Sequence, residues 1–237
     1  MSKEQINQGN NDIEAVYAEQ DSSEIRLITS PKLNYLKQVL SSAEFDWDKI
    51  LSTFHQSKVY RRGNYSGDNL TGILLETHLG LVLKEFASAI DGVCLDPVKS
   101  GDVTRNYVFK IRKDRNRLVA INKSHGNDVA EYDGIVTLTD KESVLPVVVE
   151  AKMIKKGHFS LNSIIRVSHI AQVFRPLVER FQQSEFGYIV ATSREAISFQ
   201  SPIQQAFIRS GGILLELPSS YYEFKQQSQK AWPRGMH

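Results

Sequence analysis

Apolar residues recur along this chain at two spacings, and each spacing predicts a different kind of element. Leucines stand three or four residues apart over 33–40, which predicts a helix that begins with Ser30 as its N-cap and Pro31 in its first turn. Short unbroken apolar runs at 145–149 and 187–191 predict buried strands. The chain therefore combines amphipathic helices with strands that lie inside a sheet.

The other expected elements follow from the same two spacings and from Gly, Pro and Ser at their ends. In the first half of the chain they are a helix at 46–54, a basic loop at 58–67, a long buried helix at 68–87, and strands at 92–96, 105–111, 115–121 and 131–136. In the second half they are a helix at 160–181, kinked or interrupted before Pro176, and a helix between Ser201 and Gly211. A strand at 213–217 and a helix capped by Ser219 follow. This order predicts an α/β protein with a central mixed sheet flanked by helices.

The same pattern divides the chain into four parts. Residues 1–22 are polar and acidic, which predicts a flexible arm. The helical spacing in residues 23–67 predicts an N-terminal helical layer. Residues 68–217 hold the alternating strands and helices of the core, and residues 218–237 predict a C-terminal helix and tail. A chain of 237 residues suits one large domain with small extensions.

Charge is distributed unevenly along the sequence. The whole chain carries a net charge of +2, but its first 24 residues hold one lysine and six acidic residues. The remainder has 28 basic and 21 acidic residues, a net charge of +7. A basic body favours a polyanionic partner.

Membrane insertion and several kinds of enzyme are disfavoured by composition. The apolar runs are shorter than the roughly 20 residues of a membrane span, and the N-terminus is polar. Cys94 is the only cysteine, so we expect a small core residue, no internal disulfide and a cytoplasmic location. The six histidines lack metal-binding spacing, and no Ser/His/Asp arrangement has the context of a nucleophilic hydrolase.

Charged residues interrupt the apolar pattern at one place. Glu150 and Lys152 end the run 145–149 and are two apart, so they share one face of the strand. Glu131 and Asp133 repeat this pattern on the preceding strand. Glu76 lies on the long helix, with a glycine four residues away on each side, which predicts a close approach there. Convergence of these groups predicts a site for a divalent metal and a phosphate.

Hydrolysis of a phosphodiester needs an activated water and neutralisation of charge on the phosphate, and a hard divalent cation supplies both. We expect Asp133 and Glu150 to bind the metal, with the carbonyl of Ala151 as a third ligand and Glu76 completing the site directly or through water. Lys152 would orient the water or stabilise charge on the phosphate. Glu131 would bind a second metal or orient Lys152.

The order of these residues resembles the PD-(D/E)XK nuclease superfamily, which has the restriction-endonuclease-like fold. The resemblance covers residues 68–217: an acidic residue on a helix, Asp133 on a strand, Glu150-Ala151-Lys152 on the next, then a helix and a strand. It implies a Mg²⁺-dependent nuclease core in which Mn²⁺ substitutes for Mg²⁺. It also implies that Asp133, Glu150 and Lys152 are catalytic and that Glu76 is an auxiliary ligand.

Two basic segments are candidates for contact with nucleic acid. The set that follows the motif is the better candidate because it is close to the site in sequence, whereas the hairpin set is equally well explained as a solvated hairpin. The residues expected to bind nucleic acid are Lys155, Lys156, Arg166, His169, Gln172, Arg112, Lys113 and Arg115.

The sequence thus predicts a Mg²⁺-dependent DNA endonuclease of the type II restriction or DNA-defence kind, acting on double-stranded DNA as a homodimer. Two alternatives stay open: a nuclease-fold DNA-binding or assembly subunit without cleavage activity, and a structure-specific repair or recombination nuclease. Simpler explanations exist for single residues as well. Glu150 and Lys152 would form an ion pair on an edge strand, Asp133 would belong to an Asp-Gly turn, and Glu76 would be the partner of a buried Lys or Arg.

Overall fold

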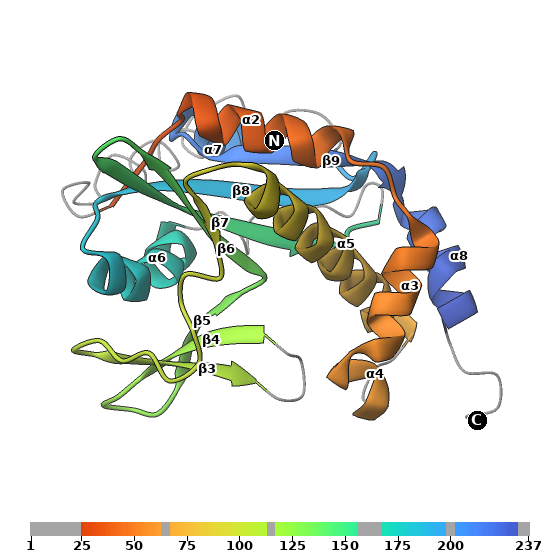
Figure 1. Cartoon of the computed structure of the whole chain (residues 1–237), viewed down its shortest axis with the longest axis horizontal. Coiled ribbons are helices and arrows are strands. Elements are labelled where there is room, and N and C mark those ends of the chain that lie inside the picture. The colour runs from red at the N-terminus through yellow and green to blue at the C-terminus, as the bar shows by residue number, and fades with distance from the viewer. Residues whose placement is uncertain (1–24, 63–66, 113–116, 156–166, 198–201, 232–237) are drawn as a thin grey trace, which may run out of the picture.

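A computed structural model describes residues 25–62, 67–112, 117–155, 167–197 and 202–231, and shows an α/β protein with two sheets (Figure 1). The main sheet contains β1 (Arg26–Leu27), β2 (Val93–Leu95), β6 (Gly134–Asp140), β7 (Ser143–Lys152), β8 (Glu185–Arg194) and β9 (Ile213–Ser220). The small sheet contains β3 (Tyr107–Arg112), β4 (Arg117–Asn122) and β5 (Asp128–Tyr132).

The main sheet is mixed, as the sequence predicts. Its order is β2-β6-β7-β8, and both β1 and β9 pair with the outer side of β8. The pairs β2–β6 and β6–β7 are antiparallel, whereas β7–β8, β8–β9 and β1–β8 are parallel. The small sheet is antiparallel throughout. The apolar strand β7 therefore lies inside the main sheet, between β6 and β8, and is not an edge.

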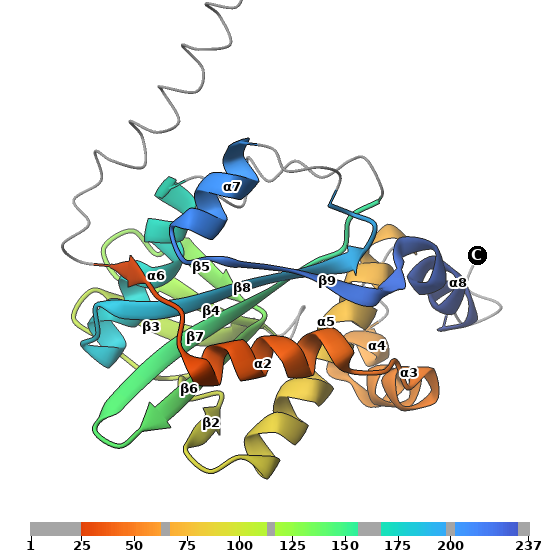
Figure 2. The ribbon, with the colours of Figure 1, turned by 90° about the horizontal axis from the view of Figure 1, so that it is seen from above.

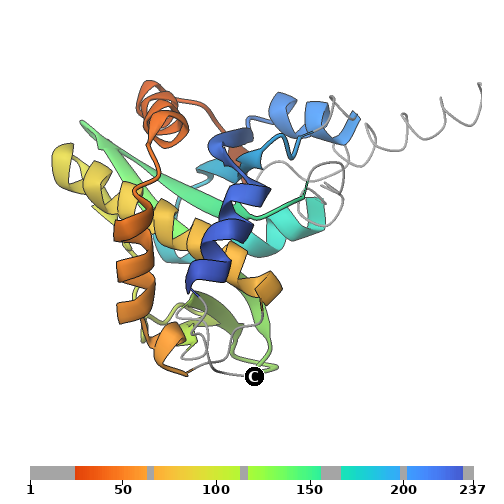
Figure 3. The same ribbon diagram turned by 90° about the vertical axis from the view of Figure 1, so that its right-hand side faces the viewer.

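Helices cover both faces of the main sheet. They are α2 (Pro31–Ser42), α3 (Trp47–Gln56), α4 (Lys58–Arg62), α5 (Gly67–Ala89), α6 (Val167–Phe181), α7 (Pro202–Arg209) and α8 (Tyr221–Ala231). One apolar core joins α2, α3, α5 and α8 to one face, and a second joins α6, α7 and the small sheet to the other. Figure 2 shows α2 and α7 on opposite sides of the sheet, and Figure 3 shows α8 against α5. Within the described ranges, every helix is too short or too polar to traverse a lipid bilayer.

The first two helices begin where their capping residues predict. Ser30 accepts a hydrogen bond from the backbone N–H of Leu33, and Asp46 accepts one from the N–H of Lys49. The expected cap of α8 is wrong by one residue. Ser220, not Ser219, accepts from the N–H of Glu223, whose carboxylate accepts from the N–H of Ser220 in return, so the pair forms a capping box.

Three expected elements differ in the structure. The loop at 58–67 contains the short helix α4, and the strand at 131–136 is two strands, β5 and β6, with Asp133 at a bend between them. Pro176 lies inside α6, which continues to Phe181. The buried residues Phe174 and Leu177 anchor α6 to the sheet on either side of the proline, and this packing offsets the lost backbone hydrogen bond.

Cys94 is exposed, so its expected place in the core is wrong. Its neighbours Val93 and Leu95 pack against the core on the α5 side. Alternate residues of a strand point in opposite directions, and the side chain of Cys94 therefore points outward.

A close approach between helix and sheet occurs at Gly134, not at the glycines that flank Glu76. A Cβ atom at Gly134 would lie 2.9 Å from Cδ1 of Leu83, so α5 lies directly against the start of β6. At Gly80 a Cβ would meet no described heavy atom within 4 Å, and at Gly72 it would meet only the carboxylate of Glu76 at 3.9 Å. Neither helical glycine has a close neighbour among the described residues, and the close approach to this face of α5 is made at Glu76 itself, by Arg117.

His78 gives the core a dependence on pH. Its imidazole is 2 % exposed and stacks on Phe45 with 3.7 Å between ring centroids, and its Nε2 has no hydrogen-bond partner among the described residues. Burial lowers the pKa of His78 from 6.5 to about 4. Between these values the unfolded chain binds a proton that the folded chain does not, so stability is lost as the pH falls from 6.5 towards 4.

We expect the free energy of unfolding to decrease by roughly 2–3 kcal/mol over that interval because of His78. Urea denaturation at a series of pH values measures this. His78→Phe keeps an aromatic ring but cannot titrate, and its stability is expected to change less over the same interval. Parallel pH profiles for the two proteins would contradict the assignment.

Candidate nuclease-type site

The candidate site lies where β7 extends beyond its neighbour β6. The last pair of the β6–β7 ladder is Gly134 with Val149, whereas β7 stays paired with β8 through Lys152. Val149 packs in the core on the α5 side and Val148 in the core on the α6 side, so Glu150 and Lys152 lie on the α6 side. The predicted shared face of Glu150 and Lys152 is confirmed.

Asp133 fills the place that β6 leaves vacant beside β7. Its Oδ2 accepts a hydrogen bond of 2.7 Å from the backbone N–H of Ala151, and its side chain is 6 % exposed. The N–H and C=O of a residue in a strand point to the same side, so the carbonyl of Ala151 lies on this edge as well. Asp133, Ala151 and Glu150 therefore meet at the end of one strand.

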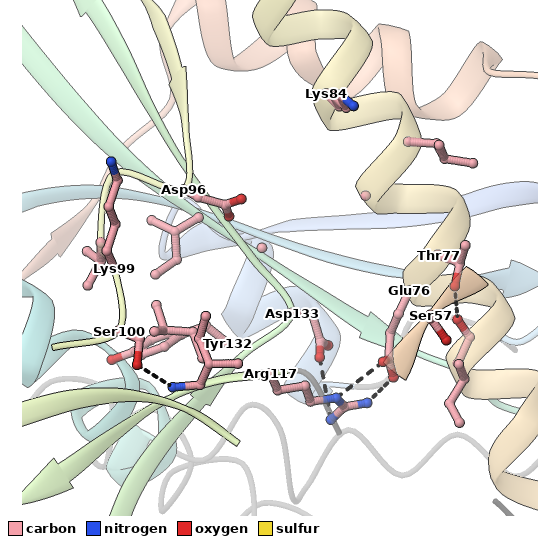
Figure 4. A pocket seen from close by; sticks show the side chains of 18 of the residues that line it. Ser57, Glu76, Thr77, Lys84, Asp96, Lys99, Ser100, Arg117, Tyr132 and Asp133 are labelled. Carbon is pink, nitrogen blue, oxygen red and sulfur yellow. Dashed lines mark hydrogen bonds and ion pairs between the residues drawn. The ribbon is translucent and has the colours of Figure 1, made fainter. Parts of the chain in front are cut away.

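Arg117, the first residue of β4, joins the acidic side chains of three elements (Figure 4). Its Nε lies 3.2 Å from Oε2 of Glu76, and its Nη2 donates to the other oxygen of the same carboxylate. Its Nη1 donates to Glu131 at 2.7 Å and lies 3.5 Å from Oδ1 of Asp133. These carboxylates raise the pKa of Arg117, although burial opposes the increase, so the guanidinium is permanently charged.

Glu76 has the partner that its simpler interpretation requires, a partly buried arginine. Burial and the nearby Asp133 raise the pKa of Glu76 to about 7, while Arg117 lowers it. Glu76 and Asp133 thus contact the same guanidinium, that of Arg117. The role of Glu76 as a metal ligand stays a prediction.

Glu150 and Lys152 form an ion pair with 2.6 Å between Oε1 and Nζ. Burial and Asp133 together raise the pKa of Glu150 to about 7, against the effect of Lys152. The pKa of Lys152 is raised because Glu150 outweighs the effect of burial. Tyr188 is buried on the same face, and both Glu150 and Asp133 raise its pKa in addition to burial. These effects place Asp133 and Glu150 within range of mutual repulsion.

In the part of the chain that the structure describes, the site has more negative than positive groups. Four carboxylates face one guanidinium and one ammonium there, which leaves these six groups with a net charge of −2 when all are ionised; they are Glu76, Glu131, Asp133, Glu150, Arg117 and Lys152. Among the described residues, no group of three or more His, Cys, Asp or Glu side chains is arranged to hold a metal ion. Mg²⁺ commonly binds through one or two carboxylates and keeps several waters, so the buried pair Asp133 and Glu150 fits its requirements.

Of the eight residues expected to bind nucleic acid, the structure describes four, and the other four lie outside the described residues. Lys155 is exposed just after β7. His169 is near Lys152, and burial together with the charge of Lys152 lowers the pKa of this histidine. Gln172 is exposed on α6, and Arg112 forms an ion pair with Asp128. The remaining four lie outside the described residues: Lys156, Arg166, Lys113 and Arg115.

A pocket of about 770 Å³ adjoins the site between α5 and the small sheet. Glu76, Arg117 and Asp133 form one end of it, and Lys84, Lys99 and Asp96 lie at the other (Figure 4). The wall between them is largely aliphatic.

Sequence reasoning missed Arg117, which is the first residue of β4 and was not among the expected site residues. The sequence signal for Arg117 is the alternation of side-chain directions along β4. Val119 pairs with Glu131, and Arg117 is two residues before Val119, so Arg117 and Glu131 share a face. That alternation becomes informative only when the pairing of β4 with β5 is known.

No protein-family model, curated protein or solved structure matches this chain. Any functional conclusion therefore rests on the residues of the chain itself.

Proposed function

We propose that this protein is a Mg²⁺-dependent endonuclease that hydrolyses phosphodiester bonds in DNA, with a restriction-endonuclease-like core. The observation that carries the proposal is the meeting of Asp133, Glu150 and Lys152 at the free end of β7. A carboxylate pair that is buried, mutually repelling and short of positive charge has little value for stability. Such a carboxylate pair supplies the ligands that a divalent cation requires.

Each group of the motif has a separate role in this proposal. Asp133 and Glu150, with the carbonyl of Ala151, would hold the cation, and the N–H of Ala151 fixes the orientation of Asp133. Bound Mg²⁺ neutralises phosphate charge and lowers the pKa of a water. Lys152 places an ammonium beside Glu150, where it would stabilise negative charge that develops on the phosphate.

The substrate and assembly follow from charge and symmetry. The basic body of the chain and the exposed Lys155 favour a polyanion, and we propose double-stranded DNA in a restriction or DNA-defence reaction. Cleavage of both strands needs two sites of opposite polarity, and a homodimer with two-fold symmetry supplies them.

A second candidate is a nuclease-fold DNA-binding or assembly subunit that does not cut. The observation that favours it is the pairing of every carboxylate near the site with Arg117 or Lys152. Such internal ion pairs stabilise the cluster without a metal.

A cleavage assay separates the two candidates. Supercoiled plasmid, linear duplex and single-stranded DNA are incubated with the protein in Mg²⁺, in Mn²⁺ and in excess EDTA. We expect cleavage in either metal and none in EDTA. Cleavage that persists in EDTA would contradict the metal-dependent mechanism, and binding of DNA without cleavage in any condition would favour the second candidate.

A further inference from the structure

We propose that the pocket between α5 and the small sheet binds one unpaired nucleotide of the substrate next to the bond that is cut. The inference rests on the proposed function, since it takes the acidic end of the pocket as the cleavage site. It adds a substrate feature, an unpaired nucleotide, and a recognition site formed by residues other than the eight expected nucleic-acid contacts.

Size and continuity are the first argument. A volume of about 770 Å³ lies within the range of about 300–1,000 Å³ that holds one small ligand, whereas a duplex needs a channel open at both sides. Asp133 and Glu76 form one end of the same pocket. A nucleotide in the pocket would therefore place its own phosphate near Asp133 and Glu76, two of the candidate catalytic groups.

The walls suit the faces of a base. Ile73 and Leu81 of α5 line one side, and Ile111 and Leu118 of the small sheet line another. A base that is turned out of the stack is held between aromatic or apolar side chains. Gly80 lies on the lining part of α5 without any described atom within 4 Å of a Cβ, so the helix leaves this space open.

Positive charge lies at the end of the pocket away from the acidic cluster. Lys84 and Lys99 are exposed, and neither forms an ion pair with a carboxylate within the described ranges. Figure 4 shows both on the opposite side from Glu76 and Arg117. Ammonium groups there would bind the phosphate that follows the unpaired nucleotide.

Asp96 supplies a polar group for the edge of the base. It lies between the two lysines, follows β2 with a φ of 52°, and its side chain has no hydrogen-bond partner among the described residues. Asp96 is exposed, and partial desolvation by its neighbours raises its pKa. A carboxylate accepts a hydrogen bond from the N4 amine of cytosine, whereas thymine carries a carbonyl oxygen at that position. The site would therefore prefer cytosine to thymine.

Gly80→Leu tests the occupant directly, because it fills the pocket while leucine has a higher helix propensity than glycine. Binding of fluorescein-labelled oligo-dC, of a duplex with one unpaired cytosine and of a fully paired duplex is measured by anisotropy in EDTA. We expect the variant to bind oligo-dC about tenfold more weakly than wild type at an unchanged or higher melting temperature. The unpaired cytosine arm shows whether the nucleotide comes from a single strand or from a distorted duplex.

Ala89→Leu is the matched control, since Ala89 is exposed on the same helix and does not line the pocket. It is expected to bind like wild type. Equal binding of oligo-dC by wild type and Gly80→Leu would overturn the proposal. So would equal loss of affinity in both leucine variants.

Asp96→Asn tests the contact to the base. Wild type is expected to bind oligo-dC about fivefold more tightly than oligo-dT, and the variant to bind both within about twofold, because an amide both donates and accepts. A wild-type preference that survives Asp96→Asn would overturn this assignment.

Failure of the pocket and failure of the nuclease proposal give different results. If wild type cleaves DNA in Mg²⁺ but Gly80→Leu does not change binding, only the pocket proposal is contradicted. If Gly80→Leu abolishes binding and wild type does not cleave, the pocket proposal is supported and the nuclease proposal is contradicted.

Discussion

Replacement of Lys152 by alanine is expected to lower the rate of DNA cleavage in Mg²⁺ by at least about 100-fold. Lys152 forms an ion pair with one member of the carboxylate pair, with its Nζ 2.6 Å from Oε1 of Glu150, and its side chain is 35 % exposed, so a phosphate can reach it. No other described lysine contacts Glu150 or Asp133. The initial rate of plasmid nicking at saturating Mg²⁺ measures the effect.

Lys155→Ala is the control for this experiment. Lys155 is three residues further along the chain and exposed, so its loss is expected to weaken DNA binding with a rate at saturating DNA within a few-fold of wild type. Melting temperatures of both variants show whether either change acts through stability. A folded Lys152→Ala protein that cuts as fast as wild type would exclude the proposed role.

The grouping of charged residues at the end of β7 was predictable from sequence because it depends on local alternation. Two charged residues that close an apolar run must share a face, and the strand that carries them must be internal, since an edge does not need Val147, Val148 and Val149. The caps Ser30 and Asp46 are local in the same sense, because each bonds an N–H three residues away.

The position of Arg117 was not predictable in that way. The ion pair of Arg117 and Glu76 joins residues 41 positions apart, from β4 of the small sheet to α5, and depends on how the small sheet is placed relative to that helix. The same packing breaks the expected strand at Asp133, because β5 belongs to the small sheet and β6 to the main sheet. The bend that separates the sheets brings Asp133 to Ala151.

Replacement of Arg117 by glutamine is expected to lower the free energy of unfolding by about 2–3 kcal/mol without divalent metal. Its guanidinium contacts Glu76, Glu131 and Asp133, and its removal changes the net charge of the cluster from −2 to −3. Glutamine retains a hydrogen-bond donor but is shorter and carries no charge, so the loss reports repulsion among the carboxylates together with the lost hydrogen bonds. Arg112→Gln is the control, because Arg112 forms an exposed pair with Asp128, and a change below about 1 kcal/mol is expected.

Addition of Mg²⁺ turns the Arg117→Gln variant into a test of cation binding that does not depend on cleavage. A ligand that binds the folded state stabilises it in proportion to the logarithm of its concentration over its dissociation constant. The variant has lost a cation that competes for Asp133, so its melting temperature is expected to rise more with Mg²⁺ than that of wild type. Equal shifts in both proteins would show that Arg117 and the cation do not share the cluster. No shift in either would remove Mg²⁺ from the site, whatever the cause of any cleavage.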